Sequence, residues 1–178
     1  MKRNIILTLT GPDRIGIVRE VTGLLLAHGA NVEISRMVRL GGEFAVLMQV
    51  ALPQGITAEL DSDLSVLIAQ GYKVSTSELN RPETKAPEGW KSFRIEVQGT
   101  DHEGIIHEVS EYLSGLGANI ESISSETTPA PTTGSPLFAM TALVVVPPNL
   151  AIPDWKAGFD TIGSKLNVEI DVFETGNA

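Results

Sequence analysis

The sequence predicts an α+β protein built from two similar halves, and three observations lead to this prediction. The stretch GPDRIGIVREVTGLLLAHGAN, Gly11 to Asn31, returns as GTDHEGIIHEVSEYLSGLGAN, Gly99 to Asn119, with each equivalent residue 88 positions later. Each copy has helical spacing of its apolar residues, and alternating runs typical of strands flank it. A polar, proline-containing segment separates the halves. A repeat that divides 178 residues almost evenly indicates two small domains.

In the first half the predicted order is strand, helix, strand, strand, helix, strand. RNIILTLT, residues 3–10, alternates in polarity and predicts the first strand. Residues on one face of a helix follow: Ile17, Val18, Val21, Leu24, Leu25 and His28. The later segments are predicted as strands at 31–40 and 43–52, joined by a glycine turn, a helix at 56–70 and a strand at 72–79.

The second half repeats this order. Its predicted segments are a strand at 92–99, a helix from 105 to 116, strands at 119–128 and 137–146, a helix at 153–166 and a strand at 167–174. The loop PAPTTGSP, residues 129–136, lengthens its hairpin. This order is that of the ferredoxin-like βαββαβ domain, in which helices cover one face of an antiparallel four-stranded sheet. We expect domains at 1–80 and 92–178, with 81–91 as the linker.

The composition argues against several classes of function. The chain has no cysteine, which removes disulfides and thiolate catalysis and fits the cytoplasm. Thirteen Lys and Arg against 22 Asp and Glu give a net charge of −9 without a basic run, so direct nucleic-acid binding is not expected. No apolar stretch approaches the roughly 18 residues of a membrane span. Phosphate-loop, dinucleotide and nucleophile motifs are absent from the sequence, so we expect neither catalysis nor a cofactor.

The turn between the first strand and the first helix of each half holds the candidate ligand-binding residues. Its aspartate precedes a helix start, where open backbone N–H groups favour an anion such as a carboxylate. Its second glycine would let a small ligand approach the backbone. We expect the asparagine that begins the second strand to lie beside this turn and to bind an ammonium group together with the aspartate. The candidates are Gly11, Asp13, Arg14, Gly16 and Asn31, and then Gly99, Asp101, His102, Gly104 and Asn119.

Each of these residue types also has a purely structural interpretation. The aspartates suit helix N-caps, worth about 1 kcal/mol each. The glycines at the helix start would permit close packing of helix on strand. The asparagines would only turn the chain after Gly29 and Gly117, which are predicted C-terminal caps. The joint recurrence favours binding, but two domains that need the same caps would also show it.

A metal site is not expected, although one group of possible ligands is dense. Asp101, His102, Glu103 and His107 lie within seven residues of sequence. Two histidines five residues apart are separated by about 140° around a helix, which does not favour a shared ion. Solvated polar residues at a helix start are the simpler interpretation.

The motif GPDRIGIV followed by GAN resembles the start of an ACT domain, and the second half resembles it as well, so that the likeness covers nearly the whole chain. Pairs of ACT domains without a further domain resemble regulators that repress the genes of the glycine cleavage system. The resemblance implies regulatory binding of a small amino acid, glycine or similar, homodimerisation, and action through a protein partner such as a transcriptional regulator. The alternative is an interaction or oligomerisation module that binds no ligand.

The second copy departs from this motif in its turn. Thr100 stands where the first copy has Pro12, and Glu103 stands where it has Ile15. A histidine also replaces the arginine between them. The second turn is therefore more polar, and it is expected to bind a different ligand or none.

Overall fold

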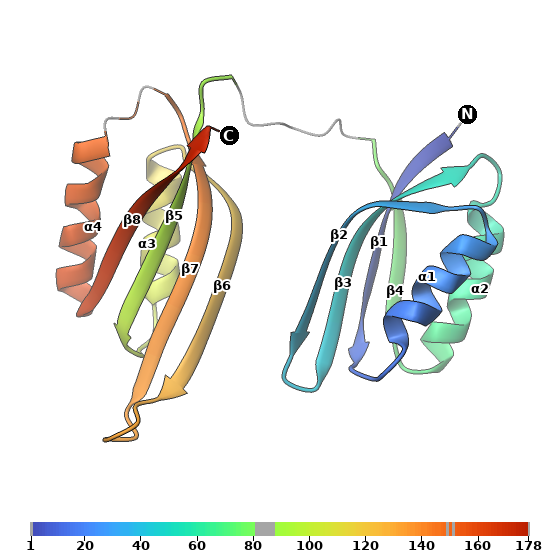
Figure 1. Ribbon diagram of the computed structural model, residues 1–178, viewed down its shortest axis with the longest axis horizontal. Helices are drawn as coiled ribbons and strands as arrows, with labels where there is room; N and C mark the ends of the chain where they lie inside the picture. The colour runs from blue at the N-terminus through green and yellow to red at the C-terminus, as the bar shows by residue number, and fades with distance from the viewer. Residues whose placement is uncertain (1, 81–87, 149, 151, 178) are drawn as a thin grey trace. The chain divides into compact units, whose positions relative to one another are not determined.

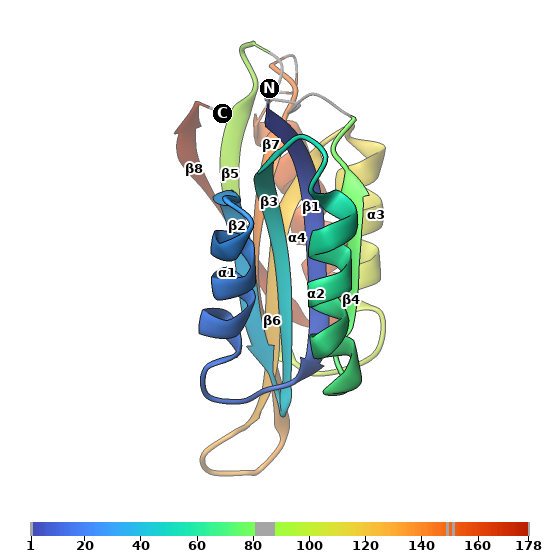
Figure 2. The ribbon, with the colours of Figure 1, turned by 90° about the vertical axis from the view of Figure 1, so that its right-hand side faces the viewer.

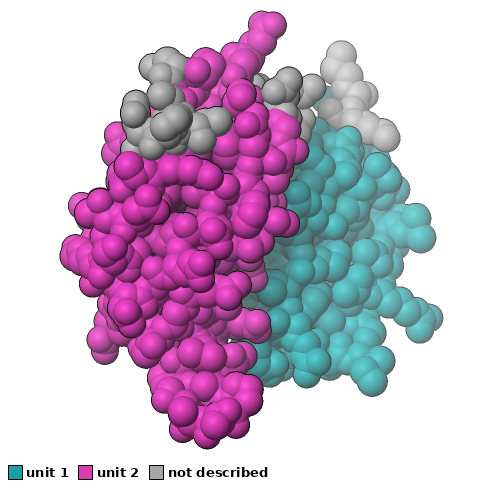
Figure 3. Space-filling view, turned by 60° about the vertical axis from the view of Figure 1, so that its left-hand side comes forward, with its two compact units in different colours: residues 1–82 teal, residues 83–178 magenta. Residues whose placement is uncertain are grey.

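The computed structural model of the chain describes residues 2–80, 88–148, 150 and 152–177. The chain divides into two compact units, residues 1–82 and 83–178, which Figure 3 colours separately. The predicted linker at 81–91 falls mainly on residues 81–87, which lie outside the described residues. Strand β5, the first of unit 2, begins at Lys91.

Unit 1 follows the order that its sequence predicts. Its elements are β1 (Lys2–Pro12), α1 (Ile17–Ala27), β2 (Asn31–Leu40), β3 (Glu43–Pro53), α2 (Thr57–Ala69) and β4 (Lys73–Glu78). The strands form an antiparallel four-stranded sheet in the order β2-β3-β1-β4. Both helices lie on one face of this sheet (Figure 1 and Figure 2).

Unit 2 has the same topology. Its elements are β5 (Lys91–Thr100), α3 (Ile105–Gly115), β6 (Asn119–Pro129), β7 (Pro136–Val146), α4 (Ile152–Leu166) and β8 (Val168–Asn177). Its sheet has the order β6-β7-β5-β8, and α3 and α4 lie on one face of it (Figure 1). The prediction of two ferredoxin-like α+β units is confirmed.

The core of unit 1 lies between its sheet and its helices. Ile5, Leu7 and Leu9 of β1 are buried, and α1 turns Ile17, Val21 and Leu25 toward the sheet. Val18 was expected on the same face, but it is 39% exposed, so the apolar stripe is narrower than the sequence pattern suggested. His28, at the helix end, lies 2.9 Å from the Asp63 carboxylate on α2.

Aromatic side chains fill the core of unit 2. The Phe93 and Trp155 rings meet edge to face with centroids 5.0 Å apart, and Trp155 and Phe159 do so at 5.7 Å. Tyr112 packs against Phe159 at 4.9 Å, and its hydroxyl donates a hydrogen bond to the Trp155 carbonyl at 2.8 Å. Because Trp155 is only 1% exposed, this cluster joins α3, α4 and β5 into one packed core.

Helix α1 ends in the glycine cap that the sequence predicts. Gly29 has φ 65°, its N–H donates to Leu26 O at 2.9 Å, and the Ala30 N–H donates to Leu25 O at 3.0 Å. This pair of bonds is a Schellman motif, which satisfies carbonyls at the helix end. Gly117, with φ 71°, closes α3 through the equivalent bonds.

Candidate functional site

The aspartate of each turn does not cap the helix that follows, so this prediction was wrong. Gly16 is the N-cap of α1 and Gly104 that of α3, and no side chain forms a cap hydrogen bond at either helix start. Asp13 lies further back, where its N–H donates to Gly42 O of the β2–β3 hairpin at 2.8 Å. Its carboxylate pairs with Arg39 Nε at 2.8 Å. First-turn N–H groups of α1 and α3 are therefore left without a side-chain acceptor.

Glycine is required at positions 16 and 104 by the backbone conformation and not by close packing. Their φ angles are 91° and 96°, which side-chain-bearing residues rarely adopt, and a Cβ atom at either position would meet nothing within 4 Å. The packing role belongs to the first glycine of each turn. A Cβ atom on Gly11 would lie 2.5 Å from Tyr72 Cδ1, and one on Gly99 would lie 2.7 Å from Val168 Cγ1.

The asparagines lie at the other end of each sheet, which corrects the expected ammonium site. Strand β2 runs parallel to β1 with β3 between them, so Asn31 and Asn4 both pair with Ala51. Asn31 therefore lies level with Asn4, near the start of β1. Gly11 is seven residues further along β1, which is about 23 Å at a rise of about 3.3 Å per residue. Asn119 takes the same place in unit 2. Neither asparagine can join the turn of its own unit around one small ligand.

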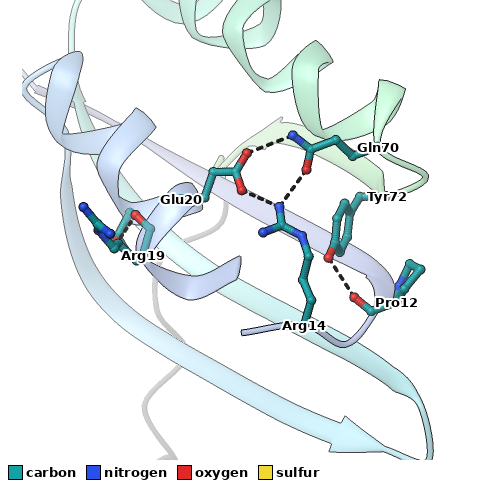
Figure 4. Close-up of polar contacts among 7 residues, drawn as sticks. Pro12, Arg14, Arg19, Glu20, Gln70 and Tyr72 are labelled. Carbon is teal, nitrogen blue, oxygen red and sulfur yellow. Dashed lines mark hydrogen bonds and ion pairs between the residues drawn. The ribbon is translucent and has the colours of Figure 1, made fainter. Parts of the chain in front are cut away.

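Arg14 is held by a polar network that the sequence did not indicate (Figure 4). Its Nη2 donates to the Glu20 carboxylate and, at 2.6 Å, to Gln70 Oε1, while Gln70 Nε2 donates to Glu20 Oε1 at 3.0 Å. The guanidinium also lies 5.6 Å from the centroid of the Tyr72 ring. The hydrogen bond with Glu20 raises the pKa of Arg14, and the same bond lowers the pKa of Glu20.

A hollow of about 490 Å³ lies beside this network along α1. It is lined by Arg14, Gly16, Arg19, Glu20, Gly23 and Leu24. Arg19 points away from the Arg14 network (Figure 4). Two cations and one carboxylate give this lining a net positive charge.

Unit 2 replaces this network with different side chains. Glu108, at the position of Glu20, pairs with Lys165 at 2.7 Å, and this hydrogen bond lowers the pKa of Glu108. His102, at the position of Arg14, contacts two carbonyls: Nε2 lies 2.7 Å from Leu166 O and Nδ1 lies 3.0 Å from Glu103 O. Both nitrogens can donate only in the imidazolium form. The bond to Leu166 is the main cause of the raised pKa of His102, followed by the bond to Glu103.

The imidazolium of His102 is expected to make the stability of unit 2 depend on pH. Because the folded-state pKa is raised, the stabilisation is complete below the ordinary value of about 6.5 and is lost as pH rises through the folded value. An NMR titration should place the His102 midpoint above about 6.5. The variant His102→Gln should lose this component of the pH dependence, whereas His107→Gln should keep it. A midpoint at or below the ordinary value would contradict the hydrogen-bonding pattern.

A second hollow, of about 570 Å³, lies at the start of α3. Its lining consists of Asp101, His102, Gly104, Ile105, Ile106, His107, Ser110 and Phe138. It combines an apolar floor with a carboxylate, two imidazoles and a hydroxyl. In each unit, therefore, the turn that the sequence singled out borders a hollow, but the two hollows differ in charge.

The described residues contain no group of three or more His, Asp and Glu side chains that could hold a metal ion. None of the helices in the described part of the chain combines the length and the apolar run needed to cross a bilayer.

The two sheets, each with two helices on one face, form a pair of ferredoxin-like domains, and the first helix of each domain begins after a glycine. A family model described as the ACT domain matches residues 3–74. A crystal structure of an unknown protein from Galdieria sulphuraria is 31% identical, with a TM-score of 0.85, and the match covers 98% of this chain and 99% of that one. The chain belongs to the ACT-domain family, as a tandem ACT-domain protein.

A further solved structure has the same fold at lower identity. It is a candidate glycine cleavage system transcriptional repressor, 20% identical with a TM-score of 0.70, and the match covers 99% of both chains. No curated protein matches this chain significantly.

Proposed function

We propose that the protein is a non-catalytic regulator that senses a small amino acid at the β1–α1 or β5–α3 turn and acts through a protein partner. The observation that carries this proposal is the hollow beside each turn. In unit 2 this hollow combines Asp101 with a helix start that no side chain caps, and in unit 1 it combines the equivalent helix start with Arg14 and Glu20. A ligand carboxylate fits the open N–H groups and the positive end of the helix. A ligand ammonium fits a carboxylate. These two charges together are those of an amino acid.

The family supports a regulatory role more than a catalytic one. The candidate repressor that shares the fold suggests that the regulated process is expression of glycine cleavage genes. With a net charge of −9, the chain is better suited to a protein partner, such as a transcriptional regulator, than to DNA. Homodimerisation and a cytoplasmic location belong to the same proposal. The ligand-binding residues in it are Gly11, Asp13, Arg14, Gly16, Gly99, Asp101, His102 and Gly104. Asn31 and Asn119 are left out, because they lie at the other end of their sheets.

A sensor must bind its ligand more tightly in one arrangement than in another, because a ligand with equal affinity for both shifts nothing. The Arg14–Glu20–Gln70 network connects the turn and α1 to the end of α2. A ligand carboxylate that competes with Glu20 for the guanidinium would loosen this connection. Ligand binding would in this way change how α1 and the end of α2 are held together, and so change the surface that a partner contacts.

The first test is thermal denaturation in the presence of each standard amino acid at millimolar concentration. A ligand at 100 times its dissociation constant should stabilise the protein by about 2.7 kcal/mol, because it binds only the folded state. The double variant Asp13→Ala, Asp101→Ala should lose this response. Gly16→Val is a poorer probe, since the φ angle of 91° would strain the variant whatever the ligand does. Absence of any shift, together with intact partner binding by the double variant, would refute the sensor.

A ligand-free interaction module is the alternative, and one surface favours it. Ile34, Val38, Leu40 and Leu47 are exposed on β2 and β3 of unit 1. Apolar groups gathered on an open sheet commonly mark an interface. Under this alternative, charged substitutions at Val38 and Leu47 would abolish assembly, and amino acids would leave the melting temperature unchanged.

A further inference from the structure

The aspartates of the two turns have equivalent backbone positions. Asp13 N–H donates to Gly42 O at 2.8 Å, and Asp101 N–H donates to Pro136 O at 3.0 Å, so each is fixed to the hairpin of its own unit. The residue that each carboxylate contacts is also equivalent. In unit 1, Phe44 pairs with Arg39 on one side and with Gly11 on the other. In unit 2, Phe138 pairs in the same way with Thr127 and Gly99, so Arg39 and Thr127 occupy equivalent positions.

The chemistry of that contact differs. In unit 1 the Asp13 carboxylate forms an ion pair with Arg39 Nε at 2.8 Å. In unit 2 the Asp101 carboxylate accepts only a hydroxyl hydrogen bond, from Thr127 Oγ1 at 3.3 Å. Among the described residues, no Lys or Arg forms an ion pair with Asp101. One aspartate is therefore neutralised by a guanidinium within its unit. The other has no such ion pair and acts on a neighbouring charge only at a distance, as one of the lesser causes of the raised pKa of His102.

The surroundings of Asp101 suit a cation that carries an aliphatic group. Ile105, Ile106 and Phe138 line the same hollow of about 570 Å³, and Phe138 is only 7% exposed. Each methylene buried on such a floor strengthens binding by about fourfold. The hollow of unit 1 is lined instead by Arg14, Arg19 and Glu20, and its one carboxylate, that of Glu20, is already paired with Arg14.

We propose that the ammonium subsite exists in unit 2 alone, with Asp101 as its acceptor, and that the hairpin position held by Arg39 in unit 1 and Thr127 in unit 2 decides which unit binds. This inference rests on the proposed amino-acid sensing. It reverses the ranking suggested by the motif, since the unit with the more divergent turn is the competent one. Amino acids with an aliphatic side chain are expected to bind most tightly, because glycine has no side chain that could pack against the apolar floor.

The experiment is isothermal titration of the full chain with L-valine, with tryptophan fluorescence recorded in parallel. One site per chain is expected. Both tryptophans of the sequence, Trp90 and Trp155, belong to unit 2, so their emission reports that unit. Asp101→Asn should weaken binding by roughly tenfold or more, because it removes the charge that the ammonium contacts. The matched control is Asp160→Asn, which removes an exposed carboxylate of unit 2 outside this hollow and should leave the affinity unchanged. Isovalerate, which lacks the ammonium, should bind as weakly to the native chain as L-valine binds to Asp101→Asn.

Exchanging the hairpin residues gives a test in both directions. Thr127→Arg should place a guanidinium on Asp101 and abolish L-valine binding, and Arg39→Thr should free Asp13 and add a second, weaker site. Arg39 and Thr127 are both exposed, so neither exchange disturbs a core.

The outcomes separate this inference from the function on which it rests. Loss of binding in Asp13→Asn but not in Asp101→Asn, or two equal sites in the native chain, would overturn the assignment to unit 2 and leave amino-acid sensing intact. Binding of glycine through Asp101 without binding of L-valine would overturn the role given to the apolar floor. If none of the standard amino acids binds, both proposals fall.

Discussion

Replacing Trp155 with alanine is expected to destabilise unit 2 by about 3–5 kcal/mol, the usual cost of removing a large buried aromatic side chain. The ring is 1% exposed and meets both Phe93 and Phe159 edge to face, so its removal leaves a cavity that several elements border. Trp90 remains in the variant as a fluorescent probe of unit 2. The urea concentration at the midpoint of unfolding should be lower for the variant than for the native protein.

Trp155→Phe is the matched control for this substitution. It keeps most of the apolar volume, and the indole Nε1 has no hydrogen-bond partner among the described residues, so no hydrogen bond is lost. The loss of stability should be well below that of the alanine variant. Equal losses in the two variants would mean that the aromatic packing is not what stabilises this core.

Gly99→Ala is the second substitution with a large expected effect, about 1–3 kcal/mol, because it overpacks a backbone contact. The added Cβ would lie 2.9 Å from both Asn167 O and Val168 Cα, so β5 and β8 must separate for it to fit. A side chain can rotate away from such a clash, but a paired strand cannot. Urea denaturation followed by tryptophan fluorescence measures the change.

Gly115→Ala provides the contrast in the same unit. A Cβ atom there meets nothing within 4 Å, and the residue ends α3, where alanine is favoured over glycine by up to about 1 kcal/mol. The two glycine variants should therefore shift the midpoint in opposite directions. Destabilisation by both would show that the effect comes from something other than the approach of β8 to Gly99.

The fold was predictable because its signals are local. Alternation marks β1, the spacing of Ile17, Val21 and Leu25 marks α1, and the glycine at position 29 marks the helix end, all within stretches of about ten residues. Repetition of the pattern in the second half then supported each assignment twice. The loop at 129–136 was also visible in its composition, and Ala130 N–H closes it by donating to Ser135 O at 2.8 Å.

The site was less predictable because its contacts are not local. Gln70 reaches Arg14 across 56 residues of sequence, and Leu166 reaches His102 across 64, because β4 and β8 lie next to the first strand of their sheets. No pattern near the turn signals these partners. The predicted placement of Asn31 beside the turn was wrong for a different reason. Strands β1 and β2 run in the same direction, so both start at the same end of the sheet, whereas the turn follows the end of β1.

The prediction that the aspartates cap the helices was wrong because too many residues lie between each aspartate and the helix start. In the stretch from Asp13 to Ile17, the chain makes one more turn and enters the helix through a glycine with φ 91°. The aspartate is thereby left to the hairpin. Its sequence preference for helix starts was correct in general but did not apply to a turn of this length.

The contact between the turn and the hairpin also affects how relatives of this chain should be compared. The two glycines and the aspartate that both turns share lie on one segment, and the residue that contacts the aspartate lies on another, at position 39 or 127. Sorting relatives by those three shared residues alone would place both units in one group. Sorting them by the charge of that hairpin residue would instead separate domains whose aspartate is paired with a guanidinium from domains whose aspartate accepts only a hydroxyl hydrogen bond.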